Sequence, residues 1–247
     1  MKTILNYSPN FENKKRKYKQ IKFLIFHYTG MKNESTAISK LTNIKSKVSS
    51  HYLIKNNGEI ITFVPDLYIA WHAGISFWKN FEFLNKNSIG IEISNPGHNF
   101  DYKRFSKKQI KAILLLSKFL IKKYQILPEN ILGHSDIAPN RKKDPGEKFP
   151  WEYLFKNKIG FWHNLDKKKI MKFRTLKVDN LEKKLFYKNI VKIGYSEKNF
   201  NNSKLKIIKR TKILTKAFQR RFRQELINGI IDQECLIISK NLTEILK

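Results

Sequence analysis

Four short stretches of the chain have the hydrophobic pattern of β-strands. Residues 22–29 contain a continuous apolar run, which is typical of a buried strand, and residues 88–94 form a second apolar run. Residues 51–54 and 59–64 flank an Asn-Asn-Gly turn that ends at Gly58. Because asparagine and glycine accept the positive φ of a tight turn, these two stretches are predicted to form a β-hairpin.

Helical periodicity separates the predicted strands. Between residues 34 and 47 apolar side chains recur at helical spacing, so we expect a helix that covers one face of a sheet. Ser106 and the glutamine three residues later form a capping box, which begins a long helix that stops before Pro128. A shorter helix is expected to begin at Pro150. Residues 1–165 are therefore predicted to be a domain of the α/β or the α+β class.

The pattern changes after residue 165. Residues 166–176 begin with a run of lysines and are predicted to be a linker, and residues 177–247 show helical spacing without a convincing strand. The length of 247 residues leaves room for a catalytic-sized domain and a small helical module. No apolar run is long enough to cross a bilayer, so no transmembrane helix is expected.

Composition and charge narrow the function classes only slightly. The hydrophobic and aromatic fractions, 41% and 13%, are those of an ordinary globular protein. A formal net charge of +30 favours polyanions such as nucleic acid, acidic lipid or an anionic cell wall. The lysines, however, lie along almost the whole chain, so compositional drift toward lysine explains the charge more simply than a selected function does. We expect a monomer.

The compartment is predicted from two features. Cys235 is the single cysteine, which excludes an internal disulfide and fits a reducing compartment, although a periplasm would tolerate it. Residues 1–20 contain no apolar segment that could serve as a secretory signal. These features favour the cytoplasm. The alternative is a periplasmic or envelope-associated protein with a missed upstream start or export route.

Three residues are candidate ligands of one metal ion. They are His27 at a strand end, His134 in Gly-His-Ser-Asp, and Asp144 in Lys-Asp-Pro-Gly. Two imidazoles and a carboxylate suit zinc, and catalytic zinc sites keep a fourth position for water, whose pKa falls to about 7. Taken singly, each is more simply a hydrogen-bonded structural residue, so the combination carries the hypothesis.

Two charged residues could complete such a site. Glu92 lies inside an apolar strand, where a carboxylate is costly to bury unless it has a partner or a function. The alternative is that Glu92 points to the exposed face of an edge strand. Lys142, two residues before Asp144, would lie close to a bound metal and could stabilise an oxyanion. In a chain this rich in lysine, its alternative is chance.

A series of short motifs runs through most of residues 1–162. The motifs are Ser8-Pro9-Asn10-Phe11, His27-Tyr28-Thr29-Gly30, Ser50-His51-Tyr52-Leu53-Ile54, Ala70-Trp71-His72-Ala73-Gly74, Asn87-Ser88-Ile89-Gly90-Ile91-Glu92, His134-Ser135-Asp136-Ile137-Ala138-Pro139, Arg141-Lys142-Lys143-Asp144-Pro145-Gly146 and Phe149-Pro150-Trp151. In content and order they resemble the type-2, AmpD/AmiD-like, zinc N-acetylmuramoyl-L-alanine amidases. The resemblance implies the α/β fold that this family shares with peptidoglycan-recognition proteins, a mixed β-sheet flanked by helices.

The resemblance also implies an activity and a set of roles. Family members hydrolyse the amide between N-acetylmuramic acid, or its anhydro form, and L-alanine of the peptidoglycan stem peptide. One Zn²⁺ ion would be bound by His27, His134 and Asp144. Glu92 would activate water and then protonate the leaving amine, and Lys142 would stabilise the developing negative charge.

Substrate contacts are less specific in the sequence. His51, Trp71 and His72 belong to family motifs near the substrate cleft, although packing of the hairpin and the following loop explains them equally. His98 and His163 match no motif and are expected to be surface or packing residues. The choice between intact peptidoglycan and anhydro-muropeptide depends on cleft loops that the sequence does not orient.

A non-catalytic peptidoglycan-recognition protein is the alternative function, because relatives of this fold bind without cutting. The presence of all three candidate ligands together with Glu92 and Lys142 favours the enzyme.

The C-terminal residues resemble the small three-helix peptidoglycan-binding module that some of these amidases carry. The likeness is found in residues 217–222, Gly229, Asp232 and Tyr195, and a plain helical appendage is the alternative.

A rival hypothesis makes residues 212–223 a recognition helix for nucleic acid, with Arg220, Arg221 and Arg223 on phosphates. We favour peptidoglycan or a muropeptide as the partner and expect no nucleic acid.

Overall fold

The computed structural model describes residues 3–201 and 203–246. Within these residues the main sheet has six strands in the order β1-β5-β4-β9-β3-β10. The strands are β1 Ile4–Leu5, β3 Phe23–Tyr28, β4 Tyr52–Ile54, β5 Ile60–Thr62, β9 Ser88–Ile93 and β10 Ile131–Gly133. β4 and β5 are antiparallel, and the other neighbours are parallel. The predicted mixed sheet is therefore confirmed.

The predicted hairpin is formed by β4 and β5, with Leu53 opposite Ile61. Gly58 in its turn has φ +85°, and a Cβ there would lie 2.8 Å from the carbonyl oxygen of Lys108. Both facts require glycine at this position. The turn thus sets the register in which β4 pairs with β5.

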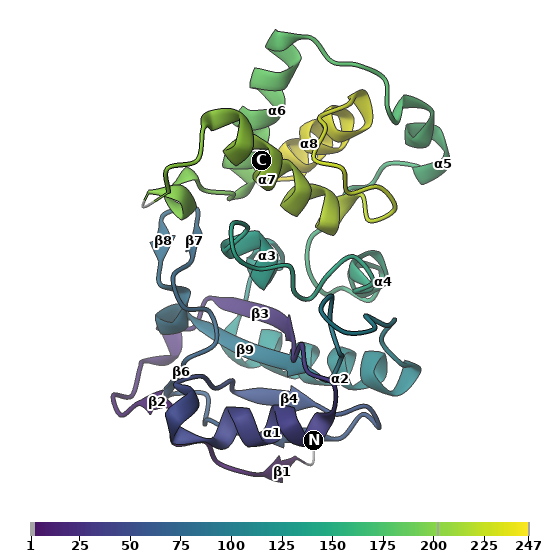
Figure 1. The fold of residues 1–247 in the computed structure, drawn as a ribbon. Helices are drawn as coiled ribbons and strands as arrows, with labels where there is room; N and C mark the ends of the chain where they lie inside the picture. The colour runs from purple at the N-terminus through teal and green to yellow at the C-terminus, as the bar shows by residue number, and fades with distance from the viewer. Residues whose placement is uncertain (1–2, 202, 247) are drawn as a thin grey trace.

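Two helices cover opposite faces of the sheet. α2, Lys107–Tyr124, starts at the predicted capping box of Ser106 and packs Ile113 and Leu116 into the larger core cluster with β3 and β9. α1, Glu34–Thr42, packs Leu41 against Leu53 in a smaller cluster. Figure 1 shows the two helices separated by the sheet. α1 is shorter than predicted, because Asn43 ends it and caps the 3-10 turn Ile44–Ser46.

The remaining helices follow β10 in the chain. They are α3 His134–Ile137, α4 Trp151–Lys156, α5 Lys167–Ile170, α6 Asn180–Ile193, α7 Ile207–Phe222 and α8 Gln233–Ile245, with 3-10 turns at Met171–Phe173 and Glu197–Phe200. The helical character predicted for the C-terminal part is confirmed. The predicted linker contains α5, and the division into two domains at residues 166–176 stays a prediction.

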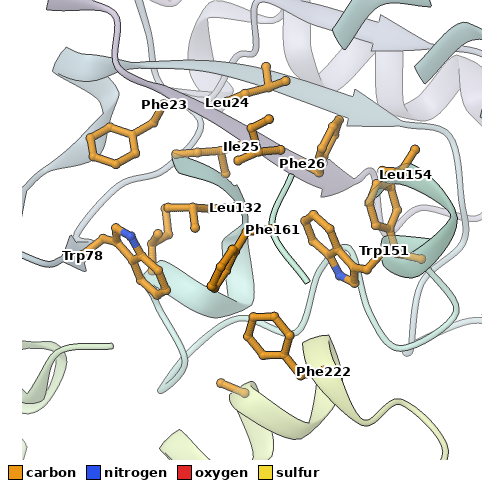
Figure 2. Packing of buried hydrophobic residues seen from close by; sticks show 14 of the residues in the cluster. Phe23, Leu24, Ile25, Phe26, Trp78, Leu132, Trp151, Leu154, Phe161 and Phe222 are labelled. Carbon is orange, nitrogen blue, oxygen red and sulfur yellow. The ribbon is translucent and has the colours of Figure 1, made fainter. Parts of the chain in front are cut away.

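The hydrophobic core continues from the sheet into the C-terminal helices. Phe222 of α7 lies 6.3 Å from Phe161 and 5.5 Å from Trp162, measured between ring centroids. Figure 2 shows Phe222 below Phe161 and Trp151, which in turn lie under β3. These residues belong to one cluster of buried side chains. The C-terminal helices are therefore packed onto the α/β part of the chain, on the side of the sheet that carries α3 and α4.

Short strands that the sequence pattern did not predict extend this contact. β7, Phe77–Trp78, pairs with β8, Phe81–Glu82, and this hairpin reaches the C-terminal helices in Figure 1. Trp78 packs edge-on against Tyr195, and the Lys79 N–H donates to the Gly194 carbonyl at 2.9 Å. β2, Phe11–Glu12, pairs with β6, Ile69–Ala70. None of the described helices is both long and apolar enough to span a membrane.

Candidate metal centre and substrate cleft

Parallel strand pairing brings the candidate ligands together. β3 ends near His27, and β10, its parallel neighbour, ends at Gly133 immediately before His134. The carboxyl ends of parallel neighbours lie at the same edge of a sheet, which is where ligand sites form in such folds. Asp144 follows on the next loop, and the Ser135 N–H donates to its backbone carbonyl at 2.8 Å. Three residues that are distant in sequence thus meet at one sheet edge.

The three donor atoms form a nearly equilateral triangle. Nδ1 of His27 lies 2.9 Å from Nδ1 of His134, and each of these nitrogens lies 3.0 Å from Oδ2 of Asp144. All three side chains are buried. A single ion can lie about 2.0–2.2 Å from all three atoms of such a triangle, the range of zinc bonds to imidazole and carboxylate. The donor set therefore fits one metal ion.

The charge states of these groups are those that a metal requires. Burial opposes ionisation of Asp144, but His134 and His27 outweigh it and hold the pKa of Asp144 well below its usual range. Burial, and then the neighbouring His134, lower the pKa of His27 to about 4. Burial likewise lowers the pKa of His134. At neutral pH the cluster is therefore two neutral imidazoles and one carboxylate, the forms that bind metal without first losing a proton.

Hydrogen bonds behind the cluster fix the ring orientations. Nε2 of His27 lies 3.0 Å from Nδ1 of His72, and Nε2 of His72 lies 3.2 Å from Oγ of Ser88. Ser88 donates its own hydroxyl proton to the Leu84 carbonyl at 2.6 Å. This series of hydrogen bonds is complete when Nε2 of His27 and Nε2 of His72 each carry the proton. Nδ1 of His27 is then unprotonated and can face a metal. Such supporting partners orient metal ligands in many sites.

His134 is supported in the same way, because its Nε2 donates to the Ala73 carbonyl at 3.1 Å. The sequence left two roles open for His72, a substrate contact or packing. Its ring lines the cleft and also contacts the candidate metal ligand His27. A Cβ on Gly90 would lie 2.4 Å from the His72 ring. Glycine at position 90 is therefore required for this ring to lie against β9.

Glu92 is the register partner of His27 across β3 and β9. β9 lies between β4 and β3, so the edge-strand alternative for Glu92 is wrong. Its side chain lines the cleft, and its Oε2 atom is shielded from solvent without a hydrogen-bond partner among the described residues. Burial, and then the charge of Asp144, raise the pKa of Glu92 to about 8. A carboxylate in this state can both accept and return a proton near neutral pH.

The raised pKa of Glu92 predicts a pH dependence of stability in the metal-free protein. Between its ordinary pKa of 4.5 and about 8, folded Glu92 keeps a proton that the unfolded chain has lost. The free energy of unfolding should therefore fall as the pH rises through this window, by at most about 1.4 kcal/mol per pH unit from this group. Glu92→Gln removes that contribution, so its stability relative to wild type should increase from pH 5 to pH 8.

Urea unfolding of both proteins with a chelator present measures this difference. Parallel stability curves for the two proteins across the window would show that Glu92 ionises normally.

The cleft in front of these residues has a volume of about 450 Å³. Among the sequence candidates, Trp71, His72, Glu92 and Lys142 line it together with His134 and Asp144. The expected substrate contact of His51 is not supported, because this ring lies away from the cleft under β9. The Gly90 N–H donates to its Nδ1 at 3.0 Å, and its Nε2 lies 3.1 Å from the Tyr68 carbonyl.

His98 is a cleft residue that sequence reasoning assigned to the surface or to packing. Its Nδ1 lies 2.9 Å from the Tyr28 hydroxyl, and its Nε2 lies 3.0 Å from Oε2 of Glu147. The ring also stacks on Tyr102 at 4.5 Å. The only local signal was the Asn-Pro-Gly turn before it, which predicts a loop after β9 but not the side that the loop faces.

Comparisons with known proteins agree with this geometry. A family model described as N-acetylmuramoyl-L-alanine amidase (Amidase_2) matches residues 17–147. The chain is 35% identical over 239 residues to the N-acetylmuramoyl-L-alanine amidase AmiD of Escherichia coli strain K12, an alignment that covers 92% of this chain and 84% of AmiD.

Two solved structures show the same fold over nearly the whole chain. E. coli AmiD, in complex with the substrate anhydro-N-acetylmuramic acid-L-Ala-D-gamma-Glu-L-Lys, superposes with a TM-score of 0.78 at 34% identity and covers 94% of this chain and 92% of its own. AmpDh3 of Pseudomonas aeruginosa, in complex with an anhydromuramic pentapeptide, superposes with a TM-score of 0.79 at 29% identity, covering 96% and 97%. Family match, sequence and fold agree, so the chain belongs to the type-2 family of N-acetylmuramoyl-L-alanine amidases.

Proposed function

We propose that this amidase uses one zinc ion held by His27, His134 and Asp144, with Glu92 and Lys142 as its catalytic residues. The proposal is carried by one observation: three buried donor atoms lie within about 3 Å of one another, beside a carboxylate oxygen that has no hydrogen-bond partner in the described part of the chain. A bound zinc ion would polarise the scissile carbonyl and lower the pKa of water. The protein residues supply positioning, proton transfer and charge stabilisation.

Glu92 moves the proton in this mechanism. Its carboxylate faces the cleft next to the metal ligands, so it can take a proton from the attacking water. The same group then returns the proton to the amine of L-alanine as the amide bond breaks. A raised pKa, about 8 in the metal-free protein, suits both steps, because an acid–base residue works best when its pKa is close to the working pH.

Lys142 is proposed to stabilise the oxyanion. It is half-buried in the cleft wall. Its positive charge lowers the pKa of His27 and of His134, and it partly opposes the burial that raises the pKa of Glu92. Its ammonium group therefore acts on the same small volume as the candidate ligands. Fixed positive charge at the place where negative charge develops lowers the barrier more than it strengthens substrate binding.

Lys142→Met is expected to lower kcat by about 10²–10³-fold, the range seen for the loss of an oxyanion donor. The zinc content should not change, because Lys142 is not among the donor residues. Lys143→Met is the matched control, since Lys143 is an exposed lysine on the same cleft wall. Steady-state kinetics on a muramyl peptide measure both. Equal losses in the two variants would assign the effect to general cleft charge.

We propose soluble anhydro-muropeptides as the preferred substrate. Both solved relatives named above contain an anhydromuramyl peptide, and the cleft volume of about 450 Å³ lies within the range of small-ligand sites. The protein should release stem peptide from a soluble anhydro-muropeptide faster than from purified sacculi, with both products identified by mass spectrometry. Faster release from sacculi would reverse this preference.

The C-terminal helices are proposed to hold peptidoglycan fragments near the cleft. The rival nucleic-acid hypothesis loses its basis, because the arginines it needs are buried. Arg221 is paired with Asp136 and Arg223 with Asp232, and Arg220 faces Glu147. Retention of the protein on purified sacculi, compared with its retention on DNA, tests the assignment. The cytoplasmic location and the monomeric state stay predictions, which cell fractionation and size-exclusion chromatography can test.

A further inference from the structure

One short helical turn connects the candidate metal centre to the C-terminal helices. α3 begins with the candidate ligand His134 and carries Asp136 two residues later. Oδ2 of Asp136 accepts from the Gly133 N–H at 2.8 Å, which closes the turn that presents His134. Asp136 is 1% exposed. A buried carboxylate of this kind holds its position only if all its polar contacts are satisfied.

Helix α7 and the loop after α6 supply the other contacts of Asp136. Arg221 of α7 donates from Nη1 to Oδ2 of Asp136 at 2.6 Å and from Nη2 to the Ile131 carbonyl of β10 at 2.8 Å. Tyr195 donates its hydroxyl to Oδ1 of Asp136 at 2.8 Å. The Arg221 guanidinium therefore hydrogen-bonds both to α3 and to β10, the strand that precedes it.

The donors themselves are held rigidly. The Arg221 guanidinium lies over the Trp151 ring, 4.3 Å from its centroid, and Tyr195 packs against Trp78. Arg221 and Tyr195 are 2% and 1% exposed. Burial, and then Asp136, raise the pKa of the Tyr195 hydroxyl well above its usual value, so it remains a donor. Both contacts are thus fixed hydrogen bonds inside the protein rather than surface ion pairs.

We propose that Arg221 and Tyr195 are positioning residues of the metal site, which act through Asp136 on His134. On this view the C-terminal helices complete the catalytic site as well as packing beside it. The inference rests on the zinc site proposed above. Metal ligands must be held to within about 0.5 Å of the productive geometry, and supporting hydrogen bonds provide that accuracy.

Arg223 offers a matched control two residues further along the chain. It is as buried as Arg221, at 2% exposed, and it forms an ion pair with Asp232. It also lies 3.6 Å from Glu234, and both acidic partners belong to the C-terminal part. Replacing Arg223 therefore removes a buried ion pair of the same kind without removing a contact to α3.

The test compares the zinc affinity of wild type, Arg221→Met, Tyr195→Phe and Arg223→Met. Zinc alone is the probe, titrated in competition with a chromophoric chelator, and circular dichroism confirms the folded fraction. Arg221→Met should bind zinc about 10–100-fold more weakly, the usual cost of losing a supporting partner, and Tyr195→Phe should show a smaller loss in the same direction. Arg223→Met should keep the wild-type zinc affinity even though it is less stable to urea.

The outcomes separate this inference from the zinc proposal itself. If wild type binds no zinc, the proposed function fails. If wild type binds zinc and Arg221→Met binds it equally well, or if Arg223→Met weakens binding as much, the positioning role is overturned. Should Arg221→Met not fold, Tyr195→Phe decides, because it removes a single hydroxyl. Wild-type affinity in that variant would contradict the proposal.

Discussion

Glu92→Gln should lower kcat by about 10²–10⁴-fold, the contribution of a positioned acid–base residue. Glutamine has nearly the shape of glutamate but cannot take a proton from water at neutral pH. The Glu92 carboxylate is not one of the three clustered donors, so zinc should remain bound. Rate measurements on a soluble muramyl peptide, together with the zinc content of the same samples, show the two effects separately.

Glu147→Gln is a suitable control for this variant. Glu147 interacts with His98 at the cleft wall. Burial raises its pKa, but the His98 contact outweighs burial and lowers the pKa below its ordinary value, so Glu147 is a weaker base than Glu92 and is not expected to replace it. We expect the Glu147→Gln substitution to change KM more than kcat. A Glu92→Gln protein that turns over at the wild-type rate with zinc bound would remove Glu92 from the mechanism.

Asp144→Ala should abolish stable zinc binding and, with it, the activity. The variant keeps two neutral imidazoles and loses the only anionic donor of the cluster. We expect zinc affinity to fall by at least about 100-fold, since loss of a mere supporting partner already costs 10–100-fold. Elemental analysis after desalting measures the metal that remains.

Asp136→Asn is the informative comparison, because Asp136 is also buried near His134 but donates no atom to the cluster. Its zinc affinity should fall less than that of Asp144→Ala. An Asp144→Ala protein that retains a full equivalent of zinc would show that the metal is held elsewhere.

Local sequence signals predicted most of the regular structure. The apolar run of β3, the Asn-Asn-Gly turn before β5 and the capping box at Ser106 each specify their element through backbone chemistry and periodicity. The sequence pattern did not predict β7 and β8, because each strand has only two residues. Their turn places Lys79 at φ +50°, so no glycine marks the turn in the sequence.

The sequence motifs predicted which residues form the candidate metal centre, but not the orientation of the histidines around it. His27, His134 and Asp144 converge as expected, since parallel β3 and β10 bring their ends together. The direction in which the side chain of a motif histidine points depends on tertiary packing, which a local motif does not specify. His51 turns under β9, while His98, without any motif, enters the cleft.

The arginines of α7 show why composition misleads about partners. In the sequence Arg220, Arg221 and Arg223 form a basic segment, yet the fold buries all three among carboxylates, whereas Lys212 of the same helix is exposed. Arginine suits buried ion pairs because its planar group makes several fixed hydrogen bonds. Only the partner residues, which lie far away in the sequence, distinguish this arrangement from a phosphate-binding surface.

Zinc titration of the metal-stripped protein tests the central claim most directly. Release of stem peptide from a muramyl peptide is followed as zinc is added back in known amounts. We predict no release before zinc is added and full activity at one equivalent, with Asp144→Ala silent throughout. Full-rate hydrolysis by a protein shown to hold no metal would contradict the account.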